Sequence, residues 1–115
     1  MVNSMKLPCT YRFADEKIKE AYYKLEHGDD QERELFKLIK QALVNIEENV
    51  FCGIQIPKRL IPKKYTQKYG IGNVWKYDLP RGWRIIYSIV REEVIIVSLV
   101  LEWFDHKEYE RRFNY

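Results

Sequence analysis

The sequence predicts an α+β domain with an antiparallel sheet of about four strands, two helices before most of the strands, and a short C-terminal helix. Two segments in the first half of the chain have apolar residues at helical spacing, and three segments in the second half have the composition of strands. The predicted helices and strands are segregated along the sequence, which is typical of the α+β class. The chain has 115 residues, so we expect residues 1–115 to form a single domain.

The two predicted helices lie near the N-terminus and are joined by a tight turn. Asp15 can cap the first helix, which we expect to end near His27, just before Gly28. Asp29 followed by Glu32 resembles a capping box at the start of the second helix. The second helix carries a long apolar stripe at i, i+3, i+4 spacing, which predicts packing against a sheet. Together the two helices form a predicted αα-hairpin.

Strand signals occur once before the helices and three times after them. Cys9–Phe13 is a candidate for a short first strand, which must pair at an edge or in the middle of the sheet. Asn73–Asp78, Trp83–Val90 and Val94–Leu101 are joined by short turns, which predicts an antiparallel meander. Val94–Leu101 is apolar on both faces, as expected of a central strand covered on both sides. A capping signal at Asp105 predicts the short C-terminal helix.

Between the second helix and the meander, Cys52–Tyr69 contains a glycine, two prolines and several lysines, and we predict a loop with a short turn of helix. Basic residues are concentrated from here onward. The segment Pro57–Arg91 has nine lysines and arginines but one acidic residue, Asp78, whereas the whole chain has a net charge of +3. Such a segment is either a phosphate-facing surface or a solvated face that keeps the protein soluble.

The composition, 46% hydrophobic and 32% charged, is that of a soluble globular protein. No segment approaches the roughly 20 apolar residues of a membrane span, and no apolar stretch follows the polar start of the chain as in a signal peptide. The two cysteines, Cys9 and Cys52, are too few for a disulfide framework and lack the spacing of metal ligands. We therefore expect a cytoplasmic protein that contacts no membrane.

One segment carries a resemblance to a known family. In GWRIIYSIVREEVIIVSLV, an aromatic–arginine–aliphatic–aliphatic–tyrosine strand leads through an acidic turn into an apolar strand. This pattern and the order of the predicted elements resemble the RelE/ParE superfamily of type II toxin–antitoxin toxins, over nearly the whole chain. The ending LEWFDHKEYERRF is similar to an archaeal branch of that family. The resemblance implies a small antiparallel sheet with the αα-hairpin packed on one face.

The resemblance also implies a function. Ribonuclease members of this family inhibit translation by cleaving mRNA in the ribosomal A site without a metal, and a cognate antitoxin binds and restrains them. The implied partners are therefore the ribosome, mRNA and an antitoxin, and the resemblance implies neither a metal nor a cofactor. Two alternatives stay open, because fold alone does not decide function. In the first alternative, the chain has the toxin fold but inhibits a protein target such as gyrase. In the second, it is a catalytically degenerate domain that binds RNA or a partner.

Metal-free RNA cleavage needs groups that move protons and cations that stabilise the phosphorane. The resemblance places Arg84 at the position of the family's strand arginine, where a guanidinium can hold two phosphate oxygens. The alternative for Arg84 is a salt bridge with Asp78 or Glu102. Lys76 approximately matches a lysine of the family, and its alternative is an exposed strand lysine.

His106 and Tyr109 complete the candidate catalytic set implied by the resemblance. A histidine can exchange a proton near neutral pH, and a C-terminal tyrosine can transfer a proton or stack on a base. The alternative for both is an ordinary structural role in the last helix. The candidate RNA-binding residues are Lys63, Lys64, Lys68, Arg81 and Lys107.

The chain also departs from the family pattern. Asp78 lies where ribonuclease members often carry a second lysine, and Glu102 and Asp105 add negative charge around the C-terminal basic position. These carboxylates raise the free-energy cost of bringing a phosphate close to the site.

Overall fold

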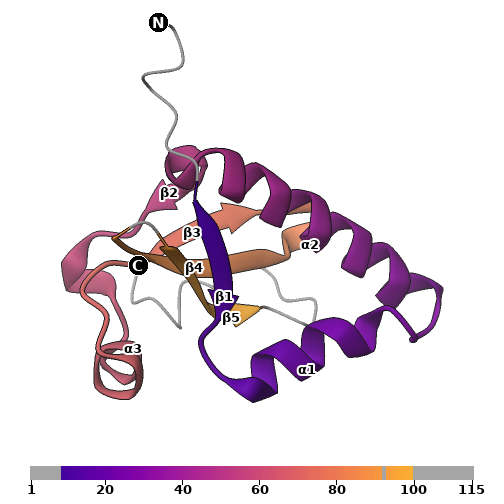
Figure 1. Ribbon diagram of the computed structural model, residues 1–115, viewed down its shortest axis with the longest axis horizontal. Coiled ribbons are helices and arrows are strands. Elements are labelled where there is room, and N and C mark those ends of the chain that lie inside the picture. Colours follow the sequence, from indigo (N-terminus) through magenta and orange to yellow (C-terminus); the bar gives the residue numbers. More distant parts are fainter. Residues whose placement is uncertain (1–8, 92, 100–115) are drawn as a thin grey trace, which may run out of the picture.

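A computed structural model describes residues 9–91 and 93–99, and these residues form a five-stranded mixed sheet with helices on both faces (Figure 1). The α+β class predicted from the sequence is confirmed. The predicted C-terminal helix lies outside the described residues. The elements in chain order are β1 (Thr10–Phe13), α1 (Glu16–Leu25), α2 (Asp30–Glu48), β2 (Ile54–Gln55), α3 (Lys63–Tyr69), β3 (Trp75–Asp78), β4 (Arg84–Val90) and β5 (Glu93–Leu99), with short 3-10 helices η2 (Val50–Cys52), η3 (Lys58–Leu60) and η4 (Pro80–Gly82).

The strand order is β1-β5-β4-β3-β2, so that β1 and β2 form the two edges of the sheet. Strands β2 to β5 pair antiparallel, whereas β1 runs parallel to β5. The prediction of an antiparallel sheet of about four strands is therefore wrong in strand number and in the direction of β1. Strand β2 has two residues and lies within the segment predicted as a loop. Strand β1 can pair in parallel because the intervening helices and strands provide the long connection that parallel pairing requires.

Helix α1 begins where the sequence predicts, because its cap is local. The Asp15 carboxylate accepts a hydrogen bond of 2.9 Å from the backbone N–H of Ile18. At the start of α2, the N–H of Glu32 donates to the Asp29 carboxylate at 2.9 Å, and the N–H of Asp29 donates to the Glu32 carboxylate at 3.1 Å. These reciprocal bonds confirm the predicted capping box.

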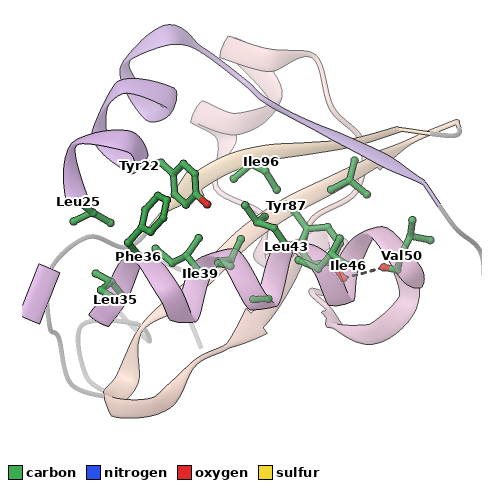
Figure 2. Close-up of a cluster of buried hydrophobic side chains, with 13 residues drawn as sticks. Tyr22, Leu25, Leu35, Phe36, Ile39, Leu43, Ile46, Val50, Tyr87 and Ile96 are labelled. Atoms are coloured by element: carbon green, nitrogen blue, oxygen red, sulfur yellow. Dashed lines mark hydrogen bonds between the residues drawn. The ribbon is translucent and has the colours of Figure 1, made fainter. Parts of the chain in front are cut away.

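The αα-hairpin covers one face of the sheet (Figure 1). The apolar stripe of α2 faces β4 and β5, as predicted, and Phe36 stacks on Tyr22 of α1 with ring centroids 4.7 Å apart (Figure 2). The buried Tyr87 hydroxyl donates to the carbonyl of Val50 at 2.9 Å. The core of this face consists of Tyr22, Leu25, Leu35, Phe36, Ile39, Ala42, Leu43, Ile46, Val50, Ile85, Tyr87, Val94 and Ile96.

The opposite face of the sheet is covered by the segment between β2 and β3, which includes η3 and α3. Its core consists of Ile56, Leu60, Tyr65, Ile71, Val74, Ile86, Ile95 and Val97. Strand β5 therefore lies between two layers, with Val94 and Ile96 facing the hairpin and Ile95 and Val97 facing α3. This arrangement confirms that β5 is covered on both sides. None of the helices in the described part of the chain combines the length and apolar content that a membrane crossing needs.

Candidate functional site

Two of the four predicted catalytic residues come together on the α3 side of the sheet. Asp78 of β3 lies opposite Arg84 of β4, and Lys76 lies opposite Ile86, whose side chain belongs to the α3-side core. Residues two apart in a strand share a face, so Lys76, Asp78 and Arg84 point to the same side. The Arg84 Nε atom lies 3.3 Å from Asp78 Oδ1, and the Lys76 Nζ atom lies 3.2 Å from Asp78 Oδ2.

The two cations of this cluster are shielded from solvent, whereas the carboxylate is not. The side chains of Arg84 and Lys76 are 13% and 14% exposed, and that of Asp78 is 48% exposed. Arg84 also donates from Nη1 to the carbonyl of Gly82 at 2.7 Å, which limits its rotation. A mostly buried cation requires an anionic or hydrogen-bonding neighbour, and Asp78 supplies one. The salt bridge given above as the alternative for Arg84 is therefore present.

Helix α3 holds the candidate RNA-binding residues Lys63, Lys64 and Lys68. The Lys68 Nζ atom lies 3.4 Å from Asp15 Oδ2, and the Tyr69 hydroxyl donates to the same oxygen at 2.9 Å. These contacts attach α3 to the start of α1. The pKa of Asp15 is lowered, mainly by the hydrogen bond that its carboxylate accepts from the backbone N–H of Ile18. The contacts with Tyr69 and Lys68 lower this pKa further. Lys68 is thus partly neutralised by a carboxylate.

Arg81 lies apart from the other candidate RNA-binding residues. It adopts a positive φ of 65° in η4, and its Nη2 atom lies 3.7 Å from Glu34 Oε1 of α2. Arg81 and Trp83 line a hollow of about 250 Å³ with residues of α2, on the hairpin side of the molecule. Arg81 therefore does not lie with the lysines of α3. His106, Lys107 and Tyr109 lie outside the described residues.

Two further basic residues, Lys58 and Arg59, lie beside Lys63 and were not among the predicted RNA-binding residues. Lys58 and Arg59 of η3 and Lys63 of α3 line a hollow of about 460 Å³. One feature of the sequence could have indicated this basic surface: no Asp or Glu occurs between Glu48 and Asp78. Only the packing of η3 and α3 brings the three cations to one hollow.

The candidate catalytic and RNA-binding residues in the described part of the chain are all lysines and arginines. Within residues 9–91 and 93–99, no group of three His, Cys, Asp or Glu side chains could hold a metal ion. Comparisons of the chain with family models, with curated proteins and with solved structures found no match.

Proposed function

We propose that this protein is the toxin of a type II toxin–antitoxin system and has a RelE/ParE-like fold. In this proposal it is a ribosome-dependent, metal-free endoribonuclease that cleaves mRNA. The observation that carries the proposal is the convergence of Lys76 and Arg84 on one oxygen-bearing group, the Asp78 carboxylate. A pair of cations that holds a carboxylate in this way has the charge and donor geometry to hold a phosphate. The αα-hairpin on one face of the sheet and the strand pattern around Arg84 also support it.

The proposed reaction forms a bond between the 2′-oxygen and phosphorus and breaks the bond between phosphorus and the 5′-oxygen. A base removes the 2′-OH proton, and an acid supplies a proton to the leaving 5′-oxygen, so that the chemistry is balanced without a further reactant. Arg84 and Lys76 would stabilise the negative charge that builds up on the phosphorane. We assign the proton transfers to His106 and Tyr109. A phosphate that enters the cluster displaces Asp78 from one or both cations.

A second candidate, a catalytically degenerate domain that binds RNA or a partner protein, is favoured by one observation. The Asp78 carboxylate already pairs with both proposed catalytic cations and is half-exposed, so it repels an incoming phosphate. If the protein is toxic, either as a ribonuclease or as an inhibitor of a target such as gyrase, we propose a cognate antitoxin as a partner, since an active toxin must be restrained in the cell that makes it.

The two candidates differ in what induced expression does to a cell. We would express the wild type, Arg84→Ala, Arg84→Lys and the control Arg33→Ala, which removes an exposed arginine of α2, and map cuts in a reporter mRNA by primer extension. The ribonuclease proposal predicts cuts by wild type and Arg33→Ala, loss of cuts in Arg84→Ala, and weak cutting by Arg84→Lys, because lysine keeps the charge but not the paired donors.

Growth arrest with intact mRNA and damaged DNA would instead support a gyrase-type target. Intact mRNA and normal growth, from soluble wild-type protein, would support the degenerate domain. Because the Arg84 side chain is mostly buried, thermal unfolding of each variant must first show that the protein is folded at the assay temperature.

A further inference from the structure

We propose that the hollow between η3 and α3 binds the phosphate backbone of RNA, as a second site beside the Lys76–Arg84 pair. This inference rests on the proposed function for its choice of RNA as the ligand. The hollow has a volume of about 460 Å³. Its rim carries Lys58, Arg59 and Lys63, and Thr66 and Gln67 of α3 add neutral hydrogen-bonding groups.

The charges around this hollow differ from those of four other cations on the basic segment, which lie close to carboxylates. Lys58, Arg59 and Lys63 are exposed and form no ion pair within the described part of the chain. Lys68, Lys76, Arg81 and Arg84 each lie within reach of a carboxylate. Three uncompensated positive charges at one concave surface concentrate the field there and attract a polyanion.

The protein holds these cations on a rigid support. Leu60 of η3, Tyr65 of α3 and the following Ile71 are each no more than 6% exposed and belong to the core on this face. Pro62 precedes α3, and Gly70 ends it with a φ of 66°, a conformation that glycine adopts without strain. Because the backbone on both sides of the hollow is fixed by core packing, the three basic residues need little reordering to bind a ligand.

The lining favours recognition of backbone over recognition of bases. Arg59 can donate two parallel hydrogen bonds to one phosphate, and Lys58 and Lys63 can neutralise its neighbours. None of the described residues that line the hollow is an aromatic residue on which a base could stack, so we expect little sequence preference. Lys76 and Arg84 lie on the same face of the sheet as α3, so that both sites are on one side of the molecule.

The test is the affinity of the full chain for a fluorescein-labelled single-stranded RNA of about 12 nucleotides, measured by anisotropy at several salt concentrations. The test variant is Lys58→Gln, Arg59→Gln, Lys63→Gln. The matched control is Lys24→Gln, Lys37→Gln, Lys40→Gln, which removes the same charge from exposed positions on the αα-hairpin.

We expect the test variant to bind at least about 10-fold more weakly and to lose about two units of the slope of log K against log[salt], since three phosphate contacts to a single strand are lost. The control should bind within about 3-fold of wild type. Equal weakening of both variants would overturn the proposal, because net charge would then explain the binding. Unchanged affinity of the test variant would also overturn it.

The variant Arg84→Ala distinguishes this inference from the proposed function, because Arg84 belongs to the proposed catalytic pair and does not line the hollow. If Arg84→Ala loses mRNA cleavage in cells but the hollow still binds RNA, both stand. If the wild-type protein binds RNA at the hollow but cuts no mRNA, the proposed binding site is supported and the proposed ribonuclease function is refuted.

Discussion

Replacing Tyr87 by phenylalanine removes one hydroxyl that links two backbone groups of the segment after α2. Tyr87 has no exposed surface, and its hydroxyl donates to the carbonyl of Val50 at 2.9 Å and accepts from the N–H of Gly53 at 3.1 Å. The variant keeps the ring and its packing, so the cost comes from the two groups that lose their partner. A buried group left unsatisfied costs about 1–3 kcal/mol. Gly53 is only partly buried, so water can solvate its N–H, and we expect a total loss of about 2 kcal/mol.

Urea unfolding followed by tryptophan fluorescence would measure this loss. With an m-value of about 1.5 kcal/mol/M, the midpoint should fall by about 1.3 M, and Tm should fall by roughly 8 °C. The control is Tyr23→Phe, because Tyr23 is 45% exposed and a surface substitution should change the free energy of unfolding by less than about 0.5 kcal/mol. A Tyr87→Phe protein as stable as wild type would refute the reasoning, as would an equal loss in the control.

Three further predictions concern Gly53, Asp15 and Cys9. Gly53→Ala should destabilise the protein by more than about 1 kcal/mol in the same urea assay, because the added Cβ would lie 2.6 Å from the backbone oxygen of Lys76. Gly72→Ala, whose Cβ would meet nothing within 4 Å, should be near neutral, and equal effects would contradict the explanation. The lowered pKa of Asp15 means that its ionised form stabilises the folded state fully above the ordinary value of 3.8, and that this contribution is lost as pH falls through the lowered pKa. The difference in unfolding free energy between wild type and Asp15→Asn should therefore shrink between about pH 5 and pH 2, and a constant difference would show that the fold does not favour the ionised carboxylate. Burial raises the pKa of the Cys9 thiol to about 11, so in a Cys52→Ser background Ellman's reagent should react slowly at pH 8 with the folded chain and rapidly after unfolding. Fast reaction of the folded chain would show that the thiol is not shielded.

Local features of the fold could be predicted from the sequence because the groups that decide them are close along the chain. Asp15 caps α1 through a residue three positions away, and the capping box of Asp29 and Glu32 spans the same distance. The strands β3 and β4 are connected by a short turn, so the juxtaposition of Asp78 with Arg84 also follows from a local pairing. For this reason the sequence already offered Asp78 as a salt-bridge partner of Arg84.

Contacts between distant segments were not predictable in this way. A strand of four residues such as β1 carries no signal for the direction of its neighbour, and its parallel pairing with β5 depends on how the αα-hairpin packs. Arg81 looked like part of the basic surface, but the positive φ in η4 and the position of α2 bring it to Glu34. Basic residues have no periodic pattern that reports their partners, because ion pairing depends on tertiary distance.

The sequence by itself therefore determined the α+β class, the two capped helices, the meander and the concentration of positive charge. The tertiary structure decided which of those charges meet a carboxylate and which, like Lys58, Arg59 and Lys63 around the hollow, have no ion pair with any residue that the structure describes. The physical reason is the range of the interactions involved. Helix caps and turns are made within a few residues, whereas a sheet edge, a covered face and a concave basic surface exist only after segments far apart in the chain have packed together.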